Sequence, residues 1–210
     1  MNISLTIEQM LSVFETYNKA TWPLQVFSCL LVIAAIILIV RTRVNTSRIV
    51  SAILSFIWLW TGVVFCIIYW ARVYTLSYGY GALYIIQGLI FFASIFKPKL
   101  SFRFEPGIHS IVGILFIVYA MAGYTLVGYF LEHIYPQSVS IILAPCPTVV
   151  LTFGLLLLTD KKIPKYILII PLLWSICGVI PVSLGILEDI GLIIAGVVGT
   201  TMILIRDRRN

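Results

Sequence analysis

Charged side chains are scarce in this sequence, and their scarcity decides the class of protein. Only 10% of the 210 residues are Asp, Glu, Lys or Arg, whereas 61% are hydrophobic, and the mean hydropathy is +1.09. Soluble domains carry about 25% charged residues. The composition therefore excludes a soluble globular domain and is typical of an integral membrane protein.

Histidine and central charges are also lacking, and each absence excludes a class of membrane protein. The two histidines, His109 and His133, flank one apolar segment and would be about 36 Å apart along a helix, which excludes a haem held by two histidines of one chain. No Lys follows Tyr166, which counts against a retinal protein, because retinal needs a buried Lys for its Schiff base. No charged residue lies in the middle third of an apolar segment, which argues against a proton pump built on a central carboxylate.

Seven apolar segments each approach the roughly 20 residues that cross a bilayer. They lie at 22–40, 49–71, 78–96, 107–130, 138–158, 166–184 and 187–205. Residues 1–21 are too polar to span and predict an amphipathic helix in the membrane interface, started by a capping box at Thr6 and Gln9. The predicted fold is a single all-α domain over residues 1–210, a polytopic bundle of about seven transmembrane helices.

The basic residues predict the orientation of this bundle. Twelve of the 14 fall in alternate loops and in the tail, as expected for loops that set the orientation of a membrane protein. Nucleic acid is therefore not an expected partner. The positive-inside rule then places the N-terminus outside and the C-terminus in the cytoplasm of a plasma (inner) membrane. The twelve are Arg41, Arg43, Arg48, Lys97, Lys99, Arg103, Lys161, Lys162, Lys165, Arg206, Arg208 and Arg209.

The fifth apolar segment contains the sequence Pro145-Cys146-Pro147-Thr148. Two prolines remove backbone donors and clash with the preceding turn, so we expect the fifth helix to be broken there. Backbone freed inside a membrane must be satisfied by protein, water or a ligand. The break is therefore the first place to look for a site.

Polar and aromatic residues gather in the outer half of the predicted bundle, where nine of the 11 tyrosines fall. They form either an aromatic belt with solvated carboxylates or a vestibule that opens outward above the proline break. The carboxylates of Glu188 and Asp189 either stabilise the N-terminus of a helix through its dipole, or bind a cation or proton. The predicted ligand-binding or pathway residues are Glu15, Tyr17, Asn18, Trp22, His133, Tyr135, Pro145, Cys146, Pro147, Thr148, Glu188 and Asp189.

The four cysteines, Cys29, Cys66, Cys146 and Cys177, would lie at a similar depth in the outer leaflet. A soft metal ion such as Cu(I) would accept four thiol ligands. Cysteine also serves as a small hydrophobic core residue, which is the commoner use. No other cofactor is expected, because phosphate-binding and dinucleotide-binding motifs are missing.

Several motifs resemble a family of small bacterial multi-pass proteins catalogued as domain of unknown function 6064. They are the opening stretch from Leu5 to Pro23, His133-x-Tyr135-Pro136, Pro145-Cys146-Pro147-Thr148, Ile170-Pro171-Leu172-Leu173-Trp174 and Glu188-Asp189-x-Gly191-Leu192. The resemblance covers nearly the whole chain. It implies a bacterial membrane protein and supports the choice of site residues, but it implies no activity.

Two functions from different classes remain open. The first is a permease for a small solute or ion, with an outward-facing site at the broken fifth helix. The second is a sensor, assembly factor or accessory subunit that transports nothing, with a second copy or another membrane protein as its partner. An enzyme ranks third, because no catalytic constellation is recognisable. The lipid bilayer is the expected surroundings in each case.

Overall fold

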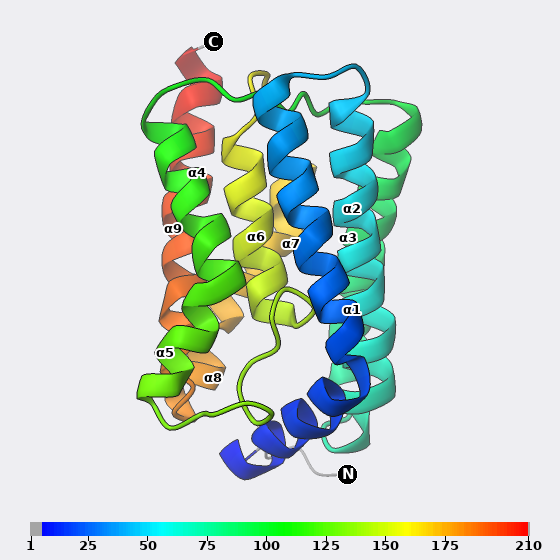
Figure 1. The fold of residues 1–210 in the computed structure, drawn as a ribbon, viewed down its shortest axis with the longest axis vertical. Helices are drawn as coiled ribbons and strands as arrows, with labels where there is room; N and C mark the ends of the chain where they lie inside the picture. Colours follow the sequence, from blue (N-terminus) through cyan, green and yellow to red (C-terminus); the bar gives the residue numbers. More distant parts are fainter. Residues whose placement is uncertain (1–5, 210) are drawn as a thin grey trace.

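The computed structural model describes residues 6–209. Within this range the regular elements are helices, and one isolated β-bridge pairs Phe102 with Thr159. The predicted all-α membrane bundle is confirmed. Six of the described helices are long and apolar enough to span a bilayer, and a seventh, shorter apolar helix lies between them. The chain runs up and down between two ends of the bundle (Figure 1).

The helices follow the expected segments closely, apart from the first and the fifth. In chain order they are α1 (Ile7–Arg41), α2 (Thr46–Trp60) with its π-helical continuation η1 (Thr61–Tyr69) and the short η2 (Trp70–Arg72), α3 (Ser77–Phe96), α4 (Ile108–Val118) with η3 (Tyr119–Gly123) and α5 (Tyr124–Phe130), α6 (Pro145–Leu157), α7 (Tyr166–Cys177) with α8 (Val179–Ser183), and η4 (Leu187–Asp189) with α9 (Ile190–Arg209).

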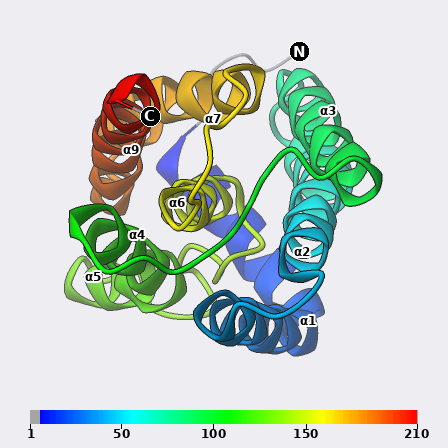
Figure 2. The ribbon, with the colours of Figure 1, turned by 90° about the horizontal axis from the view of Figure 1, so that it is seen from above.

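Helix α6 stands at the centre of the bundle. Seen from above, the six long helices form a ring around it (Figure 2). All 13 residues of α6 are buried, and Gly113 and Gly154 allow α4 to approach it closely. A helix that is apolar on every side is expected in such a position.

The expectation of a helix on both sides of the proline pair is wrong, because α6 begins at Pro145 and residues 138–144 are not helical. Pro145 and Pro147 occupy the first and third positions of α6. The first N–H groups of a helix have no intrahelical partner, so proline costs little there. The fifth segment is therefore an irregular stretch followed by a helix of about 20 Å, not a broken spanning helix.

Helix α1 joins the predicted interfacial helix and the first span into one helix of 35 residues. The predicted capping box of Thr6 and Gln9 is present, and residues 1–5 lie outside the described residues. Pro23 lies inside α1 and accounts for its bend, because proline removes a helical hydrogen bond (Figure 1). The N-terminal part crosses one end of the bundle and buries Met10 and Phe14 against it.

The loops that carry the basic clusters lie at the end of the bundle where the C-terminus emerges, opposite the N-terminal part of α1 (Figure 1). This arrangement suits the predicted orientation, which stays a prediction. We call the end that holds the N-terminal part of α1 the outer end.

Candidate ligand-binding site

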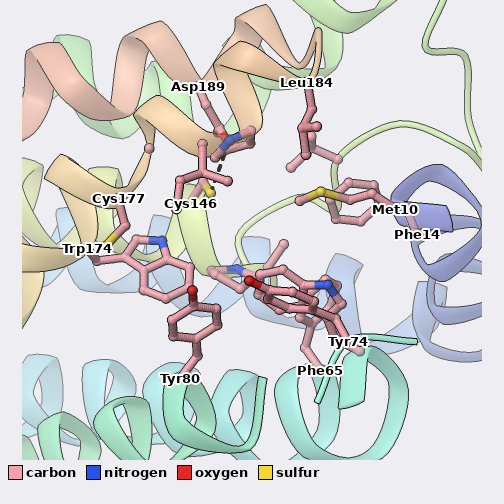
Figure 3. Close-up of a pocket in the computed structure, with 17 residues that line it drawn as sticks. Met10, Phe14, Phe65, Tyr74, Tyr80, Cys146, Trp174, Cys177, Leu184 and Asp189 are labelled. Atoms are coloured by element: carbon pink, nitrogen blue, oxygen red, sulfur yellow. Dashed lines mark hydrogen bonds between the residues drawn. The ribbon is translucent and has the colours of Figure 1, made fainter. Parts of the chain in front are cut away.

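A cavity of about 40 Å³ lies at the N-terminus of α6. Its walls come from segments far apart in the sequence: the N-terminal part of α1, η1, η2, the start of α3, the irregular stretch before α6, the start of α6, α7, α8 and η4 (Figure 3). The cavity thus lies where the central helix begins inside the bundle.

Aromatic rings form most of the cavity wall. Trp70, Tyr74 and Tyr80 pack together with ring centroids 5.6 to 6.2 Å apart. Trp174 meets Tyr80 edge to face at 5.0 Å, and Phe65 meets Trp70 at 5.9 Å. The indole N–H groups of Trp70 and Trp174 are buried and have no acceptor within residues 6–209.

Cys146 and Asp189 form the polar part of the wall. The Cys146 thiol donates a hydrogen bond to Asp189 Oδ2 at 3.1 Å (Figure 3). Asp189 is only 1% exposed, and its Oδ1 has no hydrogen-bond partner in the part of the chain that the structure describes. None of the lining residues in that part is Lys, Arg or His. A buried carboxylate without a partner is costly, so this group marks the cavity as a candidate binding site.

Glu188 points to a different neighbourhood from that of Asp189. Its Oε1 lies 2.8 Å from His133 Nδ1, and its backbone carbonyl accepts a hydrogen bond from Tyr119 at 2.7 Å. Gly128 makes room for this pair, since a Cβ there would lie 2.9 Å from Glu188 Oε1. The pair ties the loop after α5 to η4. Adjacent acids in the sequence therefore have separate surroundings.

Asn18 holds the first half of the irregular stretch before α6. Its amide Nδ2 donates to the carbonyls of Pro136 and Ser138 at 2.7 and 2.9 Å. Its Oδ1 accepts from Gln25 at 3.0 Å and from Ser140. Every polar atom of this buried side chain is used, so Asn18 fixes the path of the stretch.

Hydroxyl groups donate hydrogen bonds to backbone carbonyls in the second half of the same stretch and at the start of α6. Tyr17 donates to the carbonyl of Leu143 at 2.8 Å, Tyr84 to that of Pro145 at 2.8 Å and Thr148 to that of Ile142 at 2.6 Å. Non-helical backbone at membrane depth must be satisfied by protein in this way. The carbonyl of Pro145, one of the predicted site residues, is thus already engaged.

The remaining predicted residues lie around the cavity and not in its wall. Glu15 pairs with Lys19 and accepts from Gln137 at 3.0 Å. Trp22 and Tyr135 are exposed and line a separate open groove on the outside of α1. Pro147 is buried in α6.

The cysteines do not gather into a metal cluster. No group of three His, Cys, Asp or Glu side chains that could hold a metal ion occurs between residues 6 and 209. Cys146 and Cys177 line the cavity, whereas Cys66 is buried within η1 and Cys29 is half-buried on α1.

The sequence pattern singles out Pro145, Cys146 and Asp189 but not the aromatic wall. Trp70, Tyr74, Tyr80 and Trp174 come from three segments, and no spacing links them. The concentration of tyrosine in the outer half is the one available signal, and it predicts a vestibule without identifying its members.

A ring of apolar spanning helices around a buried half-length helix defines a polytopic helical membrane protein with an internal cavity. The chain belongs to the family of unknown function DUF6064, whose model matches residues 7–210. No curated protein and no solved structure matches the chain.

Proposed function

We propose that this protein is a small-solute permease of a bacterial inner membrane, and that its solute binds in the cavity at the N-terminus of α6. The single observation that carries the proposal is the unpartnered oxygen of Asp189, which is buried at the wall of that cavity within the described chain. A polar group of this kind in an otherwise apolar pocket is typical of a ligand site.

The short length of α6 favours a transporter over a protein in which this helix serves packing alone. Transporters commonly place their sites near the bilayer midplane, at the ends of discontinuous helices. Helix α6 begins inside the bundle, and the stretch before it continues to the outer end (Figure 1). Met10 and Phe14 of α1 line the cavity, so a movement of the N-terminal part of α1 would open it.

A second candidate is a receptor that binds the solute without passing it, as a sensor or accessory subunit would. The packing of α6 favours this function, since every residue from Pro145 to Leu157 is buried. A solute would need a rearrangement of α6 or its neighbours to continue toward the C-terminal end.

Osmotic swelling of proteoliposomes tests the proposal across several classes of solute at once. Vesicles containing the full chain are mixed with small amines, alcohols, carboxylates, sugars or salts, and the swelling rate is followed by light scattering. We expect at least one solute class to enter faster than into empty vesicles. Equal rates for all solute classes would overturn the permease proposal and favour the receptor.

A variant that fills the cavity provides the control. Leu184 lines the cavity and is only partly buried, so Leu184→Phe adds volume there without overpacking the core. The solute-specific flux should fall in this variant. An exposed change in the outer loop, Glu132→Gln, should leave the flux at the wild-type rate.

A further inference from the structure

We infer that the cavity binds a compact organic ammonium ion that also carries a hydrogen-bond acceptor, of the size of ethanolamine. This inference rests on the proposed function for the place of the site and adds the class of ligand. Four features of the cavity carry it: its charge, its aromatic wall, its lack of anion donors and its size.

The charge of the cavity favours a cation. Asp189 is 1% exposed, and its side chain accepts a hydrogen bond from the neutral Cys146 thiol; the buried hydroxyl of Tyr124, also neutral, is its other polar neighbour. The adjacent Glu188 has the same sign, and His133 is engaged with Glu188 and not with Asp189. An ionised Asp189 is therefore without a counter-charge from the described chain, and an ammonium group would supply it.

The wall is also suited to a cation. Trp70, Tyr74, Tyr80 and Trp174 line the cavity, and Figure 3 shows the last three on one side of it. The faces of such rings carry partial negative charge and attract ammonium groups, Trp most strongly. A carboxylate beside aromatic rings combines the two groups that bind ammonium in a desolvated site.

The same cavity is poorly equipped for an anion. The N-terminus of a helix normally binds anions through its free N–H groups. In α6 the first and third positions are Pro145 and Pro147, which have no N–H, so two of the first three amide donors of the helix are missing. Asp189 would in addition repel an anion.

Two donors on the wall add a requirement for an acceptor. The indole N–H groups of Trp70 and Trp174 are buried and unpaired in the described chain. A buried donor without an acceptor is costly. A hydroxyl oxygen on the ligand would accept from one of them while the ammonium group meets Asp189.

The volume limits the ligand to a few atoms. One water molecule needs roughly 10–15 Å³, so a cavity of about 40 Å³ holds about three or four non-hydrogen atoms. Ethanolamine has this size and carries both groups. 1-Propanol replaces its ammonium group by a methyl group, and acetate has a similar size with the opposite charge.

Calorimetric titration of the purified full chain in detergent tests the inference with these three probes. We expect ethanolamine to bind at least tenfold more tightly than 1-propanol and acetate at pH 7. Asp189→Asn should weaken ethanolamine binding at least tenfold and reduce its preference over 1-propanol. Glu132→Gln, which removes an exposed acid from the outer loop, should bind like the wild type.

A second variant keeps the test decisive if Asp189→Asn does not fold. Leu184→Phe fills the cavity and should abolish binding while the chain keeps its thermal stability. Equal binding of 1-propanol and ethanolamine, or unchanged binding by both variants, would overturn the inference. Binding of Ag⁺ without binding of ethanolamine would also overturn it, because that result would indicate a metal site formed by the sulfur atoms of the wall.

The inference and the proposed function fail separately. Ethanolamine binding without solute flux would support the ligand class and overturn the permease. Flux of an uncharged solute without ethanolamine binding would support the permease and overturn the ligand class.

Discussion

Gln87 Nε2 donates a hydrogen bond of 3.1 Å to the carbonyl oxygen of Ile167. Ile167 lies four residues before Pro171, which has no N–H and lies inside α7. The carbonyl therefore loses its helical partner, and Gln87 of α3 replaces it. A polar side chain in the middle of one span thus supplies the hydrogen bond that a proline removes from another span.

Gln87→Leu should lower the free energy of unfolding by about 1–3 kcal/mol, because it leaves the Ile167 carbonyl buried and unpaired. Thermal unfolding in detergent measures the change. In a Pro171→Ala background the same substitution should cost less, since alanine restores the N–H donor within α7. An equal cost in both backgrounds would show that the Gln87 bond does not compensate for Pro171.

Asn18→Ala should destabilise the irregular stretch before α6. The substitution removes the donors to the Pro136 and Ser138 carbonyls, each worth about 1 kcal/mol or more when buried. We expect a lower unfolding temperature and faster proteolysis of residues 131–144.

Thr16→Ala is the matched control for Asn18, because Thr16 is exposed and bonds only within α1. Its unfolding temperature and proteolysis rate should match the wild type. Slow proteolysis of the Asn18 variant would contradict the role of Asn18 in holding the stretch.

Gly154→Ala should separate α4 from α6. A Cβ at Gly154 would lie 2.8 Å from the Gly113 carbonyl oxygen and 3.0 Å from the Ile117 nitrogen, and neither backbone atom can move freely. Overpacking of this kind costs about 1–3 kcal/mol. Gly79→Ala meets open space and should be neutral or slightly stabilising, and thermal unfolding of the two variants compares them directly.

The orientation can be tested with reporter fusions. A fluorescent protein fused after residue 210 should fluoresce, because the basic loops predict a cytoplasmic C-terminus. A phosphatase fused after Thr75, in the loop between η2 and α3 at the other end, should be active outside. The reverse pattern would overturn the orientation and the outward position of the cavity.

Composition, hydropathy and the basic loops suffice to predict the helical bundle and most of its spans. The prediction for the fifth span is wrong because proline signals a helix start as readily as a helix break, and local sequence does not decide between the two at Pro145. The decision depends on Tyr17, Asn18 and Tyr84, which stabilise the non-helical stretch from distant positions in the chain.

The site is only partly predictable for the same reason. Cys146 and Asp189 stand out in the sequence as polar residues at special positions, and the structure brings them within hydrogen-bond distance. The wall contributed by Trp70, Tyr80 and Trp174 depends on how three spans pack together, which single-sequence periodicity does not encode.

The enclosure of α6 has a consequence for biosynthesis. Helix α6 has 13 residues, fewer than the roughly 20 that the lipid core requires, so the helix would not span the bilayer by itself. Helices α1 to α5 precede α6 in the chain, but α7 and α9, which also contact α6, emerge later. The nascent chain must therefore retain α6 beside its earlier helices until the last two arrive, and truncation before α7 should yield a product that membrane quality-control proteases degrade.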